Sequence, residues 1–117
     1  MNGTIDRFYK AMQHGPDGVD ALIDLLAEDA VYVEPFSGRT HRGRATIRAF
    51  LVQSQGQLPD VRIIVDRISV EGDTVTTEWT CESSAFATPS RGRDEFTIRD
   101  GKIERLETTL LEPPELK

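Results

Sequence analysis

The sequence predicts an α+β fold: a conical barrel of a strongly curved, mostly antiparallel sheet, with three N-terminal-half helices closing one side. Apolar residues recur at helical spacing through the first half of the chain, whereas from Pro59 onward they alternate as in β-strands. Helices first and an antiparallel meander last are typical of helices packed on one face of a sheet, and a long twisted meander curls. A chain of 117 residues is long enough for one core, so we expect a single domain at 1–112 and a C-terminal tail at 113–117.

The helices follow from apolar stripes and from the residues that end them. A first helix is predicted over 5–12, because its apolar residues share one face and Gly15-Pro16 ends the run. Asp17 can cap a second helix, whose apolar stripe extends to Leu26. A third helix is expected from about Gly43. These stripes indicate core rather than a cofactor site.

The strands follow from period-2 alternation and from turn residues. A short strand ends at Pro35, and the chain returns through 39–41. Alternating runs rich in β-branched residues predict four more strands, at 61–70, 74–87, 93–99 and 102–111. Asp100-Gly101 is a strong hairpin signal between the last two. The tail after Pro113-Pro114 is expected to be loose.

Composition excludes several classes of function. The net charge of −6 argues against binding to nucleic acid or to an anionic membrane surface. The single cysteine, Cys81, allows no internal disulfide, and no apolar run approaches the length of a membrane span. We therefore expect a cytoplasmic protein. Two isolated histidines, His14 and His41, and scattered acids give no ligand spacing, so neither a metal nor a cofactor is expected.

One acid stands in an unusual place. Glu34 lies in the stretch Ala30 to Gly38 among apolar and aromatic neighbours, and alternation puts Tyr32 and Glu34 on one face of the strand. An acid held against aromatic surface loses solvation as an anion, so its pKa is expected to rise, which suits proton transfer near neutral pH. Alternatively, Glu34 lies at the rim of its strand with its head in water.

Three phrases resemble a known superfamily: Leu-Leu-Ala-Glu-Asp-Ala-Val-Tyr-Val-Glu-Pro at 25–35, Gly-Arg-Ala-Thr-Ile-Arg-Ala-Phe-Leu at 43–51 and Asp-Glu-Phe-Thr-Ile-Arg-Asp-Gly-Lys-Ile at 94–103. With the order of elements, the chain resembles the SnoaL-like and ketosteroid-isomerase-like branch of the nuclear transport factor 2-like superfamily. The resemblance covers nearly the whole chain and implies that superfamily's cystatin-like fold. Because the superfamily hosts isomerases, cyclases, hydrolases, dehydratases and proteins that only bind, the resemblance fixes the chemistry poorly.

The resemblance also implies site residues. Ketosteroid isomerases place the general base just before a proline at the end of the first strand, where this chain has Glu34. Asp94 falls at the position that resembles their protonated Asp, a published case of a neutral carboxyl donor. Their helix-one Tyr position resembles Phe8 here, so that donor is missing unless Tyr9 or Tyr32 substitutes.

A second comparison is with limonene-epoxide-hydrolase-like proteins, which activate water with an Asp-Arg-Asp set. The corresponding positions hold Glu78, Thr80 and Thr108, so we reject that mechanism.

Alternation extends the predicted cavity to the other strands. If Asp94 faces inward, so do Phe96 and Ile98; the preceding strand is expected to turn Thr76, Glu78 and Thr80 inward, and the last strand Leu106, Thr108 and Leu110. A one-residue slip would turn Trp79 inward instead of Glu78. Asp94 could alternatively pair with Arg91 or Arg93 at the surface. The expected cavity is apolar with three acids, Glu34, Glu78 and Asp94, of which at least one should be neutral at pH 7.

The main hypothesis is acid–base catalysis by an isomerase or cyclase on a small apolar, carbonyl-bearing molecule. Glu34 would be the base and Asp94 a neutral donor. The predicted polar pocket residues are Tyr9, Tyr32, Glu78, Thr80 and Thr108, and the predicted apolar wall is Phe8, Met12, Phe36, Phe96 and Leu106.

Two other hypotheses remain: a non-catalytic ligand-binding or dimerisation module, and a scaffold subunit of a larger enzyme. A homodimer is expected through the outer sheet face, where Val75 and Trp79 would form an apolar stripe.

Overall fold

The computed structural model describes residues 3–55 and 60–116. Within them, α1 spans Gly3–Met12, a 3₁₀ turn η1 spans Gly15–Gly18, α2 spans Val19–Ile23 and α3 spans Arg44–Gln55. The first and third helices lie where the sequence predicts them. The second helix is shorter than predicted, because the backbone becomes extended at Leu26, where the strand that pairs with Ile103 begins. An apolar run alone does not distinguish a buried helix from a buried strand.

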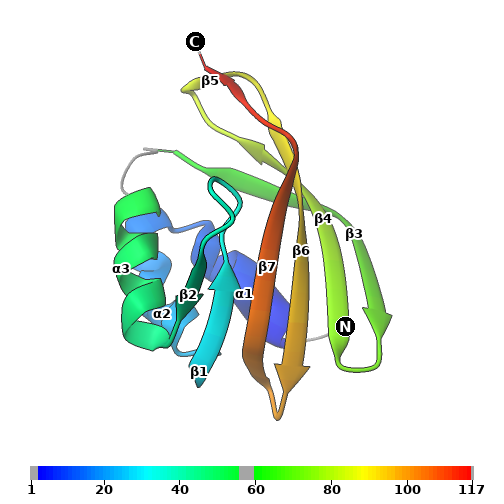
Figure 1. Ribbon diagram of the computed structural model, residues 1–117. Helices are drawn as coiled ribbons and strands as arrows, with labels where there is room; N and C mark the ends of the chain where they lie inside the picture. Colours follow the sequence, from blue (N-terminus) through cyan, green and yellow to red (C-terminus); the bar gives the residue numbers. More distant parts are fainter. Residues whose placement is uncertain (1–2, 56–59, 117) are drawn as a thin grey trace.

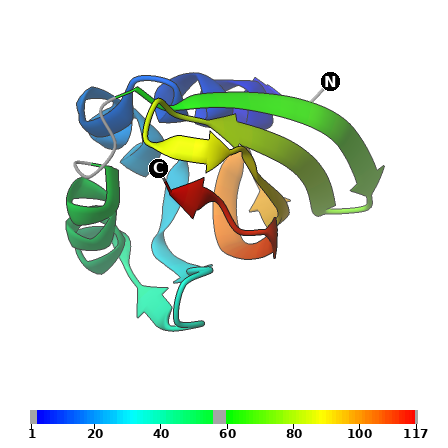
Figure 2. The same cartoon turned by 90° about the horizontal axis from the view of Figure 1, so that it is seen from above.

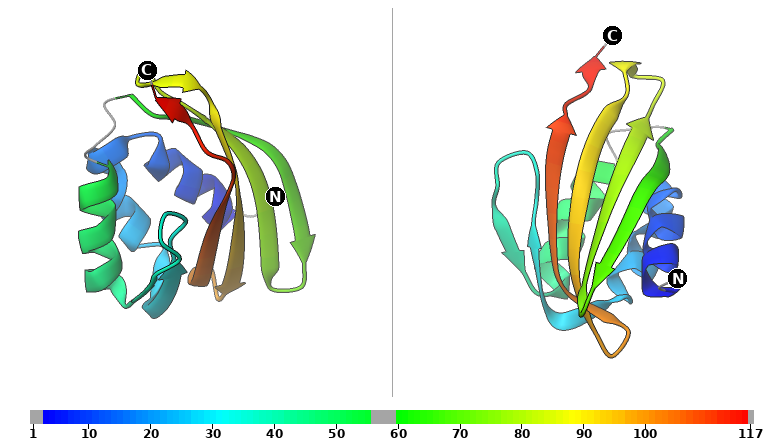
Figure 3. Two further views of the ribbon diagram at one scale, coloured as in Figure 1. Left: turned by 45° about the horizontal axis from the view of Figure 1, so that its top comes forward. Right: turned by 90° about the vertical axis from the view of Figure 1, so that its right-hand side faces the viewer.

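The main sheet has six strands in the order β2-β1-β7-β6-β4-β3. Their bounds are β1 Leu26–Val33, β2 Thr40–Arg42, β3 Arg62–Glu71, β4 Thr74–Glu82, β6 Ser90–Arg99 and β7 Lys102–Glu112. Neighbouring strands are antiparallel except β1 and β7, which are parallel. The sheet curves without closing, and the helices lie on its concave side (Figures 1 and 3). The predicted α+β architecture is confirmed, with an open sheet.

The end of the chain differs from the expectation of a loose tail. The strand predicted at 74–87 ends at Glu82, and β5, Phe86–Thr88, pairs with β8, Glu115–Leu116. The Thr88 hydroxyl also donates to the Glu115 carboxylate at 3.3 Å. Seen from above, β5 and β8 lie together over the middle of the molecule (Figure 2).

The hairpin predicted at Asp100-Gly101 is present between β6 and β7. Both residues have positive φ, 53° and 76°, as a two-residue turn matched to the twist of antiparallel strands requires. The β6–β7 pairing shifts by one residue between Ile98 and Thr97, and beyond this irregularity Asp94 lies opposite Thr108 and Phe96 opposite Leu106. Paired residues share a face, so the inward set predicted for these two strands is correct.

The core lies between α1 and the concave face of the sheet. Phe96 is completely buried, and its ring contacts Phe8 edge-on at a centroid distance of 5.1 Å. Tyr9 joins the cluster, with its ring 5.1 Å from Phe8 and 6.1 Å from Phe96. This cluster holds α1 in fixed register against β6.

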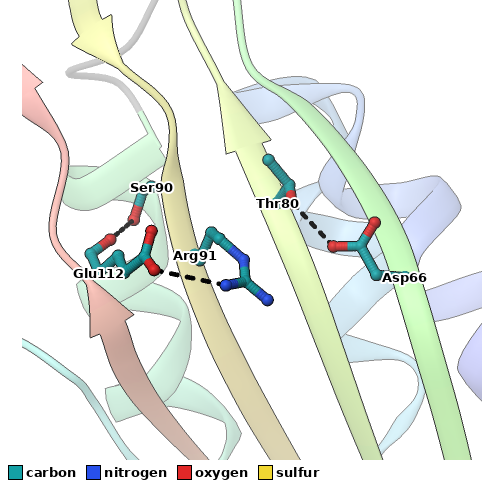
Figure 4. Close-up of polar contacts among 5 residues, drawn as sticks. All are labelled: Asp66, Thr80, Ser90, Arg91 and Glu112. Carbon is teal, nitrogen blue, oxygen red and sulfur yellow. Dashed lines mark hydrogen bonds and ion pairs between the residues drawn. The ribbon is translucent and has the colours of Figure 1, made fainter.

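The register predicted for β4 is wrong by one residue. Thr77 pairs with Asp94, and Val75 pairs with Phe96, so both face inward and are buried. Glu78 and Thr80 therefore face outward. Glu78 lies 3.8 Å from Arg67, and the Thr80 hydroxyl donates to Asp66 at 2.7 Å (Figure 4). Alternation alone leaves the parity of a strand open, and the pairing that decides it is non-local.

The correction moves Val75 and Trp79 away from the predicted dimer interface. The outer sheet face instead carries polar side chains in cross-strand and same-strand pairs, such as Arg91 with Glu112 at 3.4 Å (Figure 4) and Arg105 with Glu107 at 2.9 Å. The outer sheet face therefore lacks the apolar stripe of Val75 and Trp79 from which the homodimer was predicted. The homodimer itself stays a prediction.

Gly92 is needed for the inward position of Trp79. The two residues are paired across β4 and β6, and a Cβ added at Gly92 would lie 2.2 Å from Cζ2 of the indole. We expect Gly92→Ala to lower the free energy of unfolding by about 2 kcal/mol, because a ring packed in the core must move. Urea unfolding checks this, with Gly3→Ala as the control, since a Cβ there meets only the end of Arg7 at 3.5 Å. Equal stability of the two variants would contradict the packing of Trp79 over Gly92.

Candidate active site

A cavity of about 580 Å³ lies between the helices and the concave face of the sheet. Its wall is mainly aromatic and aliphatic, and several polar side chains open into it. The predicted site residues that line it are Phe8, Tyr9, Met12, Tyr32, Phe36, Asp94, Leu106 and Thr108. Glu34, Glu78, Thr80 and Phe96 do not line it. A cavity of this size and lining suits an apolar small molecule.

Asp94 is the acid that the structure places at this cavity. It is 4% exposed, and its carboxylate accepts hydrogen bonds from the Tyr9 hydroxyl at 2.5 Å and the Thr108 hydroxyl at 2.7 Å. The Tyr9 hydroxyl also contacts the Thr77 hydroxyl. Thus α1 and β7 each bring a hydroxyl group to one carboxyl on β6, and Thr77 of β4 is linked to that carboxyl through Tyr9.

Burial raises the pKa of Asp94 from its ordinary value of 3.8 to about 6. The hydrogen bonds from Thr108 and Tyr9 lower this pKa, and they offset part of the cost of desolvation. The indole N–H of Trp79 also favours the anion, although it makes no hydrogen bond of normal geometry with any described residue. Asp94 therefore changes charge close to neutral pH, where a proton-transfer group works best.

Two tyrosines next to Asp94 keep their protons. Burial, and then the charge of Asp94, raise the pKa of Tyr9 and the pKa of Tyr32 well above the usual range. The side chain of Thr108, which donates to Asp94, lies close to the Tyr32 hydroxyl and offsets part of this rise in the pKa of Tyr32. Both phenols are therefore neutral hydrogen-bond donors at the polar end of an apolar cavity.

The expected rise in the pKa of Glu34 is wrong. Its carboxylate accepts from the backbone N–H of Phe36 at 2.7 Å and of Ser37 at 3.0 Å, and also from the Ser37 hydroxyl. Burial alone would raise the pKa of Glu34, but these hydrogen bonds and one from the Arg39 backbone lower it below its ordinary value. Glu34 is 2% exposed, so it is not at the rim in water either.

The remaining sequence alternatives are settled by contacts. Asp94 does not pair at the surface with arginine, since Arg91 lies beside Glu112 and Arg93 beside Glu95, at 3.9 Å. His41 is half-buried, and its ring lies 4.7 Å from Phe50. Its Nε2 is buried without a hydrogen-bond partner among the described residues.

Of two residues that surround Asp94, sequence reasoning missed Thr77 and gave Trp79 only as the alternative to Glu78. Thr77 was expected to face outward, yet it is fully buried and contacts Tyr9. Trp79 lines the cavity. The signal that could have found them is Gly92, because a glycine inside a strand often marks a place where a large group lies close to the backbone.

Tyr9→Phe tests the hydrogen bond directly. Loss of one hydroxyl that stabilises the anion should raise the pKa of Asp94 by about one pH unit, while the ring keeps its packing on Phe8. Carboxyl-carbon NMR measures this titration. Tyr32→Phe is the matched control, since its hydroxyl contacts Thr108 rather than Asp94 and its effect should be smaller. An unchanged titration in Tyr9→Phe would show that this bond does not act on Asp94.

A curved sheet with three helices on its concave side defines the nuclear transport factor 2-like class. Within it, the family model for the SnoaL-like domain matches residues 5–106, so the chain belongs to the SnoaL-like family. No curated protein sequence matches this chain.

Solved structures share this fold. A proposed polyketide cyclase of Sinorhizobium meliloti superposes with a TM-score of 0.80 at 24% identity, over 93% of this chain and 95% of that one. A proposed ketosteroid isomerase of Kribbella flavida superposes with a TM-score of 0.77 at 19% identity, over 99% of this chain and 81% of that one. An epoxide hydrolase of Mycobacterium tuberculosis that resembles limonene-epoxide hydrolase superposes with a TM-score of 0.74 at 22% identity, over 93% of this chain and 80% of that one. These likenesses establish the fold alone.

In residues 3–55 and 60–116, no helix is long and apolar enough to cross a membrane. No group of three or more His, Cys, Asp or Glu side chains there could hold a metal ion.

Proposed function

We propose that this SnoaL-like protein catalyses proton transfer next to a carbonyl group of a small apolar molecule, as an isomerase or cyclase does. The observation that carries the proposal is Asp94, a buried carboxyl with a pKa of about 6 that opens into an apolar cavity. A carboxylate that is mostly ionised at pH 7, yet costly to keep ionised, is a competent general base. In this proposal Asp94 takes the role that the sequence suggested for Glu34.

The proposed reaction starts with a C–H bond next to a carbonyl. Asp94 accepts the proton, and the electron pair of that bond moves onto the carbonyl oxygen to give an enolate. Tyr32, a neutral phenol beside Thr108, donates a hydrogen bond to that oxygen. In an isomerisation of a ketone with a β,γ double bond, the proton returns from Asp94 to the γ-carbon and the double bond moves into conjugation with the carbonyl. In a cyclisation, the enolate carbon bonds to the carbon of a second carbonyl, the electron pair of that C=O bond moves onto its oxygen, and Asp94 returns its proton to that oxygen to give a hydroxyl.

Comparisons support this class without fixing a substrate. Similar structures carry proposed polyketide cyclase and ketosteroid isomerase roles. Tyr9 also supports it: the sequence has Phe8 where a donor was expected, and the neighbouring Tyr9 bonds to Asp94 instead. A cytoplasmic location would fit such an enzyme and remains an expectation.

Deuterium exchange into 2-tetralone, a bicyclic ketone, tests the proposal without knowledge of the natural substrate. We expect the protein in D₂O to speed exchange at the carbons next to the carbonyl, with a rate that rises as Asp94 ionises through about pH 6. NMR follows the loss of the proton signals. Saturable binding of 2-tetralone with no exchange above the buffer rate would favour the alternative of a ligand-binding module.

A further inference from the structure

The loop that follows β1 is tied to one carboxylate. Both oxygens of Glu34 accept from the loop: Oε2 from the Phe36 N–H at 2.7 Å, and Oε1 from the Ser37 N–H and hydroxyl and from the Arg39 N–H at 3.3 Å. The Glu34 N–H also donates to the Arg39 carbonyl at 3.1 Å. A carboxylate with this many donors within one loop fixes the backbone of that loop.

The same loop carries two residues of the cavity wall. Pro35 is half-buried, whereas Phe36 is 72% exposed although it lines the cavity. A large apolar side chain that is both in an apolar wall and in water marks the place where the cavity opens. The loop projects toward the end of the molecule where β5 and β8 lie, and Phe86 and Pro114 at that end also line the cavity (Figure 1).

We propose that Glu34 is a positioning residue that holds Phe36 at the cavity mouth, where Phe36 binds the distal apolar part of elongated ligands. The inference rests on the proposed function, because it requires a ligand in the cavity. Water is displaced from the exposed ring only when a ligand is long enough to cover it. Phe36 therefore selects for ligand length, whereas Asp94 recognises the polar end that short and long ligands share.

Two phenols of different length separate these contributions. 2-Naphthol has two fused rings, and 17β-estradiol carries its phenol at the end of four. Equilibrium dialysis should show that Phe36→Ala raises the Kd of estradiol about 10-fold, as expected when a large aromatic contact is lost, and that of 2-naphthol less than about 3-fold. Leu111→Ala is the control, since that exposed side chain does not line the cavity.

A double-mutant cycle tests whether Glu34 acts through Phe36. Glu34→Ala should weaken estradiol binding about as much as Phe36→Ala, and the double variant should be no weaker than Phe36→Ala alone. Glu28→Gln is the control, since Glu28 is an exposed acid on β1, the strand just before this loop. In Glu34→Ala the amide protons of Phe36 and Ser37 should lose protection from exchange, a readout that needs no ligand.

Glu34→Gln distinguishes positioning from base catalysis. Glutamine keeps one acceptor oxygen, and 2-tetralone is as short as 2-naphthol, so we expect its KM and its saturated exchange rate each to change by no more than about 3-fold. A saturated rate that falls by about 10³-fold would make Glu34 a catalytic base and overturn the inference.

The outcomes separate the two proposals. If the wild type binds neither phenol, the proposed function fails, and unprotected loop amides in Glu34→Ala would still establish the positioning role. If 2-naphthol binds but estradiol does not, or if Phe36→Ala binds both like the wild type, the length selection by Phe36 is wrong. If the Phe36 and Ser37 amides stay protected in Glu34→Ala, the positioning role of Glu34 is wrong.

Discussion

Asp94→Asn should reduce the exchange of 2-tetralone by about 10³-fold, the usual contribution of a general base. Asparagine keeps the size of the side chain: its Oδ1 can accept from one of the Tyr9 and Thr108 hydroxyls, and its amide N–H can donate to the other, so the cavity keeps its shape. What is lost is the group that takes the proton. The assay is NMR-detected deuterium exchange at about pH 7.5, with 2-naphthol binding measured on the same samples.

Glu95→Gln is the matched control for this variant. Glu95 is the next residue on β6, faces outward and lies 3.9 Å from Arg93, so its substitution removes a carboxylate without touching the cavity. We expect it to exchange 2-tetralone at the wild-type rate. If Asp94→Asn kept more than about a tenth of the wild-type rate, Asp94 would not be the base.

Asp94→Asn should also make the protein more stable than the wild type above neutral pH. The pKa of Asp94 is about 6 in the folded chain against an ordinary 3.8, a difference of about 2 pH units. Ionisation of the buried carboxyl therefore lowers the free energy of unfolding by about 3 kcal/mol. Below about pH 4 the group is protonated in both states and costs nothing. The cost grows between the two pKa values and is complete above about pH 6.

Asparagine carries no charge, so it escapes this cost. The difference in the free energy of unfolding between Asp94→Asn and the wild type should therefore increase by about 2 to 3 kcal/mol from about pH 4 to about pH 8, in favour of the variant. Urea unfolding at the two pH values gives this difference, and comparison with the wild type cancels the other acids. A constant difference would mean that Asp94 titrates normally. Stability sacrificed at one buried group is expected where a site is built for function.

Much of the fold could be predicted because its signals are local. The apolar stripe of α1, the alternation of β6 and the Asp100-Gly101 turn each depend on neighbouring residues. Asp94 and Thr108 were placed correctly on the inner face by alternation within each strand, although the pairing shifts by one residue between them and the turn. Residue chemistry and parity are enough in such a case.

Register across a longer connection could not be predicted. β4 and β6 are joined through residues 83–89, which include β5, so no tight turn sets their pairing. The one-residue slip exchanged Glu78 and Thr80 for Thr77 and Trp79 as inner residues. Only the pairing of Thr77 with Asp94, which depends on tertiary structure, decides between the two.

The chemistry of Glu34 depended on backbone geometry that a sequence does not show. Aromatic neighbours correctly indicated that Glu34 is buried. The sign of its pKa change, however, depends on hydrogen bonds from Phe36, Ser37 and Arg39 in the loop that follows. Asp94 has hydroxyl donors only from other elements, and desolvation prevails there. Two buried acids thus have opposite pKa changes, because one accepts hydrogen bonds from its own loop.

The carboxyl-carbon titration of Asp94 in the folded protein, with and without 2-naphthol, tests most directly whether Asp94 is a buried base. We expect a midpoint at about pH 6 that moves when the phenol binds, while Glu34 titrates below its ordinary range. A midpoint for Asp94 near its ordinary 3.8, unmoved by 2-naphthol, would contradict both the buried base and the ligand site beside it.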